Sequence, residues 1–362
     1  MHCLKNTHDS HGDLKITLYE RNEVHRVSIT DWQNLQTNCK VVNPFYEDWH
    51  LLPALEHLTE SNDIYLVTVY QHQKMVALFP IEKHKLYGVL PQLRIWQHDH
   101  AFMTDPLILN AININPILNQ ISYYLGCVFS LIPQHKSPDL VSRTSAVDSN
   151  SVYSAAYERA AIFSQNKLEV HLDSLSGKPK RELLRSKRKL ENKFSTRFIT
   201  FNNLEKGLKA YQSLEHSGWK GEKKGSILSL SSTKCFYHDL IKNGSDKNIE
   251  IQGLMADSQL IASAIRIKSN DHFFEIKTTY DENFRSFSPG KLLEWNLLQD
   301  LSSRNFKSVD SCTSHQNKLI NWLWPERVSF YRSYVFGQHP ISKVISALHN
   351  AKQWIEKRYT HA

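Results

Sequence analysis

Cysteine is scarce in this chain. There are five cysteines in 362 residues, and no two of them form a Cys-x-x-Cys pair. Their odd number and wide spacing suggest neither a disulfide framework nor a zinc site. Cys312 and His315 form a Cys-x-x-His pair, for which a buried, unreactive cysteine beside a loop histidine is a simpler interpretation than thiol catalysis. The 19 histidines are scattered, so we expect no metal site.

Long hydrophobic runs are also missing. The first ten residues contain no apolar segment of a secretory signal, and the longest apolar stretch, near residues 123–133, is far too short to span a bilayer. We therefore expect a cytoplasmic protein without a membrane span. Hydrophobic residues make up 41% of the chain and charged residues 22%, which excludes a disordered protein. The length is sufficient for two domains, each with its own core.

Positive charge is concentrated in one segment. Residues 178–193 hold eight lysines and arginines against two glutamates, a net charge of +6, whereas the whole chain carries +8. Leu183, Leu190 and Phe194 follow at helical spacing, which predicts an amphipathic helix with a thin apolar stripe. This helix is either a solvated surface or a docking surface for an anionic partner such as CoA phosphates, an anionic glycan or lipid, or tRNA. No DNA-recognition motif accompanies it.

The chain contains an internal repeat. Residues 64–83 and 249–268 both consist of a strand, a polar turn and a second strand, with Ala77 and Ala262 at the same position. Their offset is close to half the chain, which favours tandem copies of one α/β unit. The serine-rich segment 142–154 has the composition of a linker. We predict an N-terminal unit, residues 1–170, and a C-terminal unit, residues 171–362, which the basic helix opens.

The most informative segment is residues 272–301. It predicts a strand, a short polar loop ending at Pro289 and Gly290, and a helix that begins at once. The first N–H groups of such a helix lack intrahelical partners and lie at the positive end of its dipole, where a phosphate or pyrophosphate binds well. Arg285 adds a cation, and Gly290 allows close approach of a ligand. The corresponding region of the first repeat, residues 96–108, has no glycine, so we expect the nucleotide-like ligand in the second unit.

Side chains alternate between faces along a strand, so Phe274, Ile276 and Tyr280 are predicted to share one face, and Glu275, Lys277 and Thr279 the other. Glu275 and Lys277 would either form a structural ion pair or have a catalytic or acceptor-binding role. Asp281, at the strand end, is a base or a loop cap. Asp310, at the end of a predicted strand over residues 306–311, is a second candidate base.

Eight short segments together resemble one superfamily. They are NPFY (43–46), RKLE (188–191), LEHSGWKG (214–221), FY (236–237), IKTTYD (276–281), SPGKLL (288–293), DSC (310–312) and WPER (324–327). Because these segments occur in this order, the chain resembles the GNAT (Gcn5-related N-acetyltransferase) superfamily. It is most similar to the cellulose-biosynthesis-associated (CelD-like) acetyltransferases, whose double-GNAT layout is similar to that of the FemAB peptidyltransferases. Ser288 departs from the family pattern, because it replaces the middle glycine of the pyrophosphate loop.

The resemblance implies an α/β (α+β) fold of two tandem GNAT-like units, each a mixed, mainly antiparallel sheet flanked by helices. It also implies transfer of an acetyl or other acyl group from acyl-CoA to an amine, on an amino sugar or a polysaccharide or cell-envelope precursor. Such a transfer needs no covalent nucleophile, so the lack of a Ser-His-Asp or Cys-His signature does not exclude it. The alternatives are aminoacyl transfer from tRNA, as in FemAB proteins, and a double-GNAT protein that binds a glycan or protein without catalysis.

Site residues are predicted on the same basis. Tyr280 or Tyr331 would protonate the leaving thiolate. Trp219 and Lys220 would belong to the acceptor cleft, unless Trp219 and Gly221 form a turn that supports the core. The candidates are Asp281, Asp310, Tyr280, Lys277 and Glu275 for catalysis, Arg285, Ser286, Ser288, Gly290 and Lys291 for acyl-CoA, and Trp219, Lys220, His98 and His100 for the acceptor.

Overall fold

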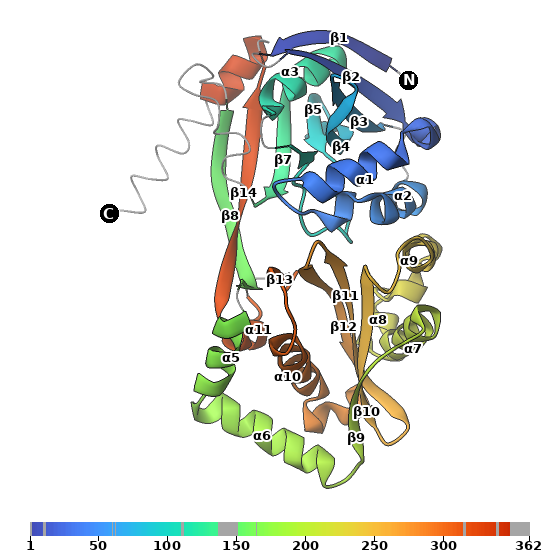
Figure 1. The fold of residues 1–362 in the computed structure, drawn as a ribbon, viewed down its shortest axis with the longest axis vertical. Coiled ribbons are helices and arrows are strands. Elements are labelled where there is room, and N and C mark those ends of the chain that lie inside the picture. Colours follow the sequence, from blue (N-terminus) through green and yellow to red (C-terminus); the bar gives the residue numbers. More distant parts are fainter. Residues whose placement is uncertain are drawn as a thin grey trace, which may run out of the picture. The chain divides into compact units, whose positions relative to one another are not determined.

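The chain folds into two compact units, shown as a ribbon in Figure 1. Unit 1 comprises residues 1–48, 60–157 and 329–362, and unit 2 comprises residues 49–59 and 158–328. Each unit therefore takes chain from both sides of residue 170. The computed structural model describes the backbone of residues 2–9, 12–59, 61, 63–109, 112–136, 151–163, 165–313, 316–337 and 340–347, without the side chains of residues 2–13, 151–156 and 165–166. His315 and most of the predicted linker, residues 142–150, lie outside the described residues.

Unit 1 is a mixed sheet with helices. The order of its strands is β1-β2-β3-β4-β5-β7-β14, with β6 beside β4. All neighbouring pairs for which the register is described are antiparallel except β5 and β7, which are parallel. Its elements are β1 (His2–Asp9), β2 (Gly12–Glu20), η1 (Arg21–Arg26), α1 (Ile29–Asn38), η2 (Pro44–Tyr46), β3 (Ile64–Gln71), β4 (Lys74–Leu86), β5 (Leu90–Ile95), β6 (Leu107–Ile108), α3 (Ile114–Tyr124), β7 (Phe129–His135) and most of β14 (Glu326–Phe336).

Unit 2 repeats this architecture. Its strand order is β9-β10-β11-β12-β13-β8, with one parallel pair, β12 and β13. Its elements are most of α2 (Asp48–His57), the end of β8 (Ser151–Ile162), α5 (Gln165–Ser174), α6 (Gly177–Glu191), β9 (Thr196–Thr200), α7 (Leu204–Ser217), α8 (Trp219–Glu222), η3 (Ile227–Ser229), α9 (Ser231–Asn243), β10 (Ile249–Ala256), β11 (Gln259–Ser269), β12 (His272–Tyr280), η4 (Glu282–Phe287), α10 (Pro289–Ser302), β13 (Ser308–Asp310) and α11 (Lys318–Leu323).

The internal repeat predicted from sequence is confirmed in detail. In the β3–β4 hairpin Val69 lies opposite Ala77, and in the β10–β11 hairpin Leu254 lies opposite Ala262. A register shift follows immediately after Val69 and after Leu254, so the two hairpins share a β-bulge at the same place. The fold prediction of two mixed, mainly antiparallel α/β units is therefore correct.

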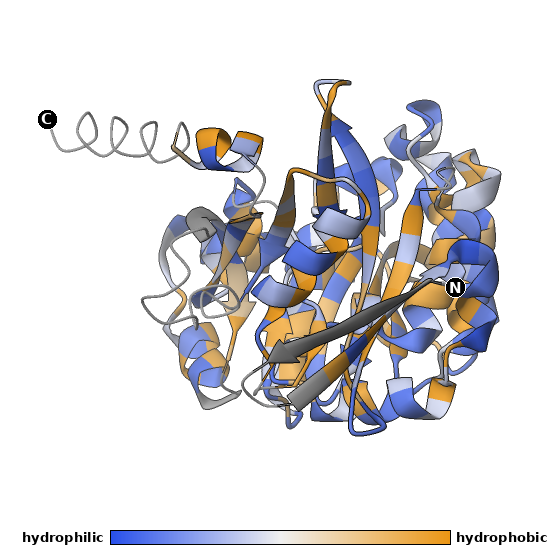
Figure 2. Ribbon diagram, turned by 90° about the horizontal axis from the view of Figure 1, so that it is seen from above, coloured by the Kyte–Doolittle hydropathy of each residue, from blue (hydrophilic) through white to orange (hydrophobic). Residues whose placement is uncertain are grey.

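Burial explains why the central strands are rich in branched residues. Residues 261–267 of β11 are all buried, because α7 covers one face of the unit 2 sheet and α10 the other (Figure 1). Figure 2 shows hydrophobic positions recurring along the strands. On α10, the buried core residues include Leu293, Leu297, Leu298 and Leu301. Burial of each leucine side chain contributes about 1.5–3 kcal/mol.

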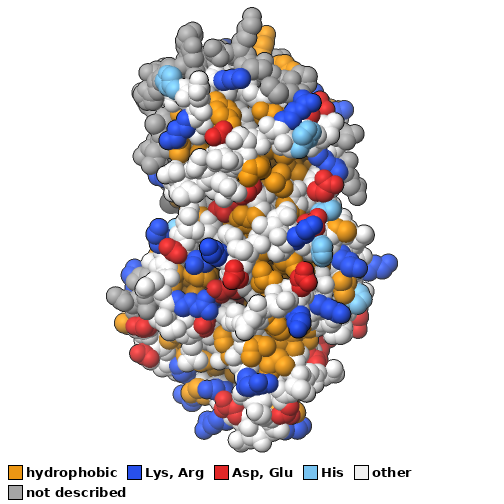
Figure 3. Space-filling view, turned by 45° about the vertical axis from the view of Figure 1, so that its right-hand side comes forward, with side chains coloured by type: hydrophobic (Ala, Val, Ile, Leu, Met, Phe, Trp, Pro, Cys, Tyr) orange, Lys and Arg blue, Asp and Glu red, His pale blue; other side chains and the backbone are white. Residues whose placement is uncertain are grey.

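The basic segment is a helix, as predicted. α6 buries Leu183 and Leu190 and exposes most of its other residues. Two of its lysines lie over aromatic rings: Lys180 Nζ is 4.0 Å from the centroid of Trp295, and Lys189 Nζ is 4.8 Å from that of Phe287. α6 therefore packs against both η4, which joins β12 to α10, and α10 itself. On the face drawn in Figure 3, acidic, basic and hydrophobic side chains are interspersed.

Candidate functional site

Unit 2 contains a cavity of about 340 Å³ where two parallel strands diverge. β12 and β13 pair only over three positions, from His272 opposite Ser308 to Phe274 opposite Asp310. β12 then continues to Tyr280, while the other chain turns at Cys312, which has a positive φ of 49°. The cavity is lined by residues of β12, the start of α8, the first turns of α10 and the chain after β13.

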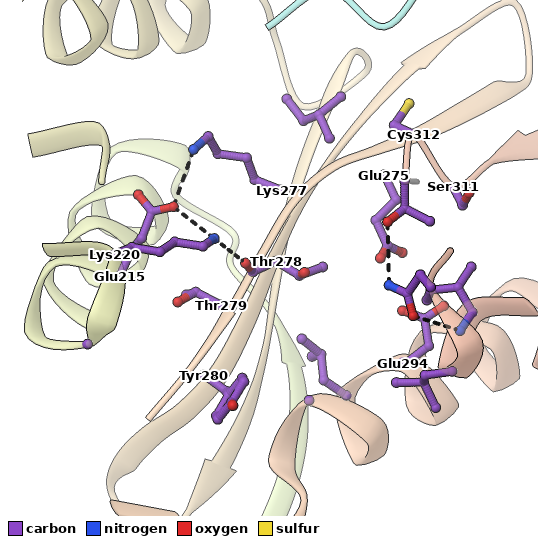
Figure 4. Close-up of a pocket in the computed structure, with 18 of the residues that line it drawn as sticks. Glu215, Lys220, Glu275, Lys277, Thr278, Thr279, Tyr280, Glu294, Ser311 and Cys312 are labelled. Carbon is purple, nitrogen blue, oxygen red and sulfur yellow. Dashed lines mark hydrogen bonds and ion pairs between the residues drawn. The ribbon is translucent and has the colours of Figure 1, made fainter. Parts of the chain in front are cut away.

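A β-bulge in β12 decides which side chains share a face. Arg266 of β11 lies opposite Glu275 and Ile265 lies opposite Lys277, so Ile276 is an extra residue. Glu275 consequently points toward α10, and Lys277 points toward α7 (Figure 4). The prediction that Glu275 and Lys277 share a face was wrong, and so was a structural ion pair between them, because Lys277 pairs with Glu215. The catalytic or acceptor-binding role stays a prediction. Strict alternation fails here because the bulge inserts one residue between them.

On the α10 side, the cavity wall carries two buried carboxyl groups, Glu275 and Glu294. Trp324 Nε1 donates a hydrogen bond to Glu294 Oε1 at 2.5 Å. Glu275 Oε2 is buried and has no hydrogen-bond partner in the described part of the chain. Burial raises the pKa of Glu275 well above its ordinary value of 4.5, and the charge of Glu294 raises it further, while Arg266 opposes both. Burial also raises the pKa of Glu294, although the Trp324 hydrogen bond lowers it. The pair therefore retains a proton more strongly than a solvent-exposed carboxyl group.

On the α7 side, one carboxylate gathers two lysines (Figure 4). Glu215 Oε1 lies 3.2 Å from Lys220 Nζ and 3.3 Å from Lys277 Nζ, and Glu215 Oε2 accepts the Ile227 N–H at 2.8 Å. Lys220 Nζ also donates to the Thr278 carbonyl at 2.8 Å. Burial raises the pKa of Glu215, but Lys277, the Ile227 N–H and Lys220 outweigh burial and keep that pKa below 4.5. Burial lowers the pKa of Lys277 below its ordinary value of 10.5, and the charge of Glu215 offsets this lowering only in part.

The strand, loop and helix predicted over residues 272–301 are all present. The loop is the 3-10 helix η4, and Pro289 occupies the first turn of α10. Ser288, between them, adopts the left-handed conformation, with φ 55° and ψ 51°. This is a conformation that glycine adopts most readily, so a serine here carries backbone strain. Gly290 lines the cavity, and a Cβ built on it would lie 3.4 Å from Tyr280 Cδ1.

The remaining cofactor candidates lie outside the cavity lining. Arg285, Ser286 and Lys291 are exposed, and Arg285 and Lys291 form no ion pair within the described residues. Lys189 Nζ of α6 lies 3.4 Å from the Ser286 carbonyl oxygen, so α6 brings further positive charge to this loop. The loop at the start of α10 therefore combines a helix N-terminus with several exposed cations.

The two predicted aspartates have other partners. Asp310 is buried and forms a bidentate ion pair with buried Arg159, with Nε to Oδ1 at 2.6 Å and Nη2 to Oδ2 at 2.8 Å. Asp281 caps η4 by accepting the Asn283 N–H at 2.9 Å, and it accepts a hydrogen bond from Gln259 at 2.8 Å. Neither aspartate lines the cavity.

The structure thus separates the predicted residues into three groups. The first group lines the unit 2 cavity: Glu275, Lys277, Tyr280, Gly290, Trp219 and Lys220. The second group lies near it on unit 2 without lining it: Asp281, Asp310, Arg285, Ser286, Ser288 and Lys291. The third group, His98 and His100, belongs to unit 1, as does Tyr331. His98 is buried and accepts the His100 N–H through Nδ1 at 3.2 Å.

Sequence reasoning did not single out Glu215, Glu294, Trp324 or Arg159. Glu215 lies within the LEHSGWKG segment, and Trp324 opens the WPER segment, so both were near a recognised motif. Glu294 is an acidic residue among buried leucines of α10, a position that a charged side chain occupies only with partners. An acidic residue in this apolar stretch was the sequence feature that could have identified Glu294 as a site residue.

Two further observations concern metals and membranes. In the part of the chain that the structure describes, no three histidine, cysteine, aspartate or glutamate side chains gather as a metal-binding group. Within the same part, every helix is too short or too polar to cross a bilayer.

Comparison with known families identifies the domain that holds the cavity. Residues 177–317 match the family described as the acetyltransferase (GNAT) domain. This segment is therefore similar to GNAT domains. It covers less than half of the chain, and it contains the cavity-lining residues except Leu319 and Ile320. No curated protein matches the sequence.

Solved structures share the fold of almost the whole chain. The C-terminal domain of a protein described as a lysylphosphatidylglycerol synthetase from Agrobacterium fabrum aligns with a TM-score of 0.55 and 11% identity, over 90% of this chain and 95% of that one. FemX aligns with a TM-score of 0.54 and 8% identity, over 88% and 98%. A conserved protein of unknown function from Bacteroides thetaiotaomicron aligns with a TM-score of 0.51 and 8% identity, over 86% and 98%. At these identities the similarity shows the fold alone.

Proposed function

We propose that unit 2 transfers an acyl group, in the simplest case acetyl, from acyl-CoA to an amine. One observation carries the proposal. A single cavity in the GNAT domain is bounded by the buried carboxyl of Glu275 and by Gly290 in the first turn of α10. A proton-transfer group and an anion-binding helix terminus therefore face the same enclosed space.

The start of α10 supports binding of the CoA diphosphate. Pro289 has no N–H, and the Lys291 and Leu292 N–H groups donate to the Ser288 carbonyl, so the Gly290 N–H is the backbone donor at the positive end of the helix dipole. Arg285 and Lys291 provide exposed cations beside it. Gly290 carries no side chain to block access from the cavity. The thioester end of the cofactor would then extend between β12 and β13, where the strands no longer pair.

The two carboxyl groups fit the proton balance of the reaction. When the amine attacks the thioester carbonyl, the nitrogen gains a bond to carbon and must lose a proton, and the sulfur leaves as a thiolate that must gain one. A carboxyl pair that holds one proton can accept the first and donate the second. Glu275 lines the cavity with an unpaired Oε2, so we assign it direct contact with the reacting groups. Glu294, held by Trp324, positions the shared proton.

The opposite wall of the cavity is proposed to receive the acceptor. Trp219 is 46% exposed at its rim, and Lys220 and Lys277 surround Glu215 there. Tyr280 lines the cavity beside Gly290 and is a second candidate donor of a proton to the thiolate. An acceptor on an amino sugar or a polysaccharide precursor, as in CelD-like acetyltransferases, rests on the sequence resemblance alone.

Aminoacyl transfer from tRNA is a second candidate, and the exposed basic residues of α6 favour it. A tRNA-binding surface predicts binding that weakens steeply with added salt. A CoA site depends less on salt, because only a few phosphate charges are involved. A double-GNAT protein that binds without catalysis would release no CoA from any donor and acceptor.

The decisive experiment combines binding and turnover. Thermal unfolding is followed with acetyl-CoA, longer acyl-CoAs, free CoA and tRNA, since a ligand at 100 times its Kd adds about 2.7 kcal/mol to the free energy of unfolding. Release of the CoA thiol is then measured with amino sugars and other amines. We expect stabilisation by CoA compounds and acceptor-dependent thiol release. Stabilisation by tRNA only, in low salt, would contradict the proposal.

A further inference from the structure

Unit 1 repeats the strand arrangement that creates the unit 2 cavity. Its order β2-β3-β4-β5-β7-β14 corresponds to β9-β10-β11-β12-β13-β8, and β5 and β7 are its parallel pair. Like β12 and β13, they pair over three positions, from Gln92 opposite Phe129 to Arg94 opposite Leu131. The same topology therefore leaves an opening beyond the paired residues in each unit.

That opening is a cavity of about 460 Å³. This volume lies within the range of about 300–1,000 Å³ that small-molecule sites occupy. Its wall is formed by the end of β5 and the residues after it, by β7 and by β14, all within unit 1. No residue of it was assigned a role above except His98.

The wall carries opposite charges that are not paired with each other. Arg332 and Asp99 both line the cavity and are exposed, and neither forms an ion pair within the described residues. The other charged group in the wall, Arg94, is bound through Nε and Nη2 to Glu82 Oε2. The cavity therefore offers one unneutralised cation and one unneutralised anion to a ligand.

Neutral polar groups complete the wall. Gln97 Nε2 donates to Gln134 Oε1 at 2.6 Å and to the Ala101 carbonyl at 3.0 Å, which fixes both glutamine side chains. The Nε2 group of Gln134 forms no hydrogen bond among the described residues and remains a donor for a ligand. Phe102 and Tyr334 supply apolar surface beside these groups.

The unit 1 cavity lacks the feature that suits unit 2 to a nucleotide. No helix begins directly after β5: residues 96–106 form irregular chain without a glycine, and α3 begins only at Ile114. A diphosphate would find no helix N-terminus here. The ligand must instead be compact and must match the two separate charges.

We infer that the unit 1 cavity binds a small zwitterion, a molecule with a carboxylate and an ammonium group such as an α-amino acid. Arg332, with Gln134, binds the carboxylate, because a guanidinium offers paired donors to the two oxygens. Asp99 binds the ammonium group. This site is distinct from the acyl-CoA site and does not depend on it.

The test uses the full chain and ligand-observed NMR titration with three probes: L-serine, which carries both charges, lactate, which carries only the carboxylate, and ethanolamine, which carries only the ammonium group. We expect L-serine to bind at least tenfold more tightly than either other probe. Arg332→Gln and Asp99→Asn should each weaken L-serine binding at least fivefold. Lys74→Gln, an exposed cation elsewhere in unit 1, is the matched control and should change nothing.

Three results with L-serine and lactate would overturn the inference, and a fourth comes from phosphate. They are equal binding of lactate and L-serine, binding of L-serine that neither Arg332→Gln nor Asp99→Asn weakens, and no binding of L-serine to the folded protein. Inorganic phosphate serves as a fourth probe. Phosphate binding that is tighter than L-serine binding and is lost in Arg332→Gln would show a simple anion site instead. Folding of each variant is verified by its unfolding temperature, since both substituted residues are exposed and their replacement leaves the core intact.

Discussion

Glu275 and Lys277 are separated by one residue on β12 and yet lie on opposite faces of the unit 2 sheet, because Ile276 is the extra residue of a β-bulge. Glu275 joins Glu294 under α10, whereas Lys277 reaches Glu215 on α7. Both line the same cavity, so the bulge places an acidic group and a basic cluster on its two walls. The following predictions test what each group does.

Glu275→Gln should abolish most of the activity and preserve the fold. A positioned acid or base contributes about 10²–10⁴-fold to rate, so kcat should fall within that range. The rate of CoA thiol release measures kcat. Glu222 is an exposed residue of α8, and Glu222→Gln is the control. Full activity in a folded Glu275→Gln variant would rule out its assigned role.

The same substitution predicts a change in stability with pH. The folded protein raises the pKa of Glu275 above its ordinary value of 4.5, so the folded state binds this proton more tightly than the unfolded state. The wild type therefore loses stability as pH rises from about 4.5 to the folded pKa. A glutamine does not titrate, so the unfolding temperature of Glu275→Gln should rise relative to wild type across this window. A constant difference at all pH values would contradict the raised pKa.

Glu294→Gln and Trp324→Phe should shift the pH–rate profile in opposite directions. Removing the Glu294 charge removes a cause of the raised Glu275 pKa, so the acid limb of kcat/KM should move to lower pH. Removing the Trp324 donor raises the pKa of Glu294, so the pair retains its protons to higher pH. The acid limb of the kcat/KM profile should therefore move to higher pH. If the two variants shift the limb in the same direction, Glu294 does not position the proton.

Arg285→Ala should weaken CoA binding about 10- to 150-fold, since a charge-assisted hydrogen bond contributes about 1.5–3 kcal/mol. Gly290→Val should weaken it further, because the added side chain extends into the cavity beside Tyr280. Gly290→Ala should bind nearly normally, because its Cβ makes an ordinary contact of 3.4 Å. Calorimetry with CoA measures all three, and Lys307→Ala, an exposed cation before β13, is the control. Unchanged affinity in Arg285→Ala and Gly290→Val would show that the diphosphate binds elsewhere.

Arg159→Met and Asp310→Asn should each lower the free energy of unfolding by about 3–5 kcal/mol, because each leaves a buried charge without its partner. Urea denaturation measures this effect. A double variant, Arg159→Met with Asp310→Leu, should recover part of the loss, since no unpaired charge remains. If Asp310→Asn loses activity at unchanged stability, the catalytic role predicted from sequence would be supported instead.

The sequence by itself determined the elements that depend on local pattern. The repeated hairpins, the α6 helix with its leucine stripe, and the strand, loop and helix over residues 272–301 all follow from spacing and turn chemistry, which act between near neighbours.

Only the tertiary structure decided which residues share a site. The bulge at Ile276 depends on pairing with β11, the Arg159–Asp310 ion pair joins residues 151 positions apart, and Glu294 meets Trp324 from another element. Strand alternation and helix periodicity contain no information on such pairings. They arise when distant segments pack together and buried charges must find partners.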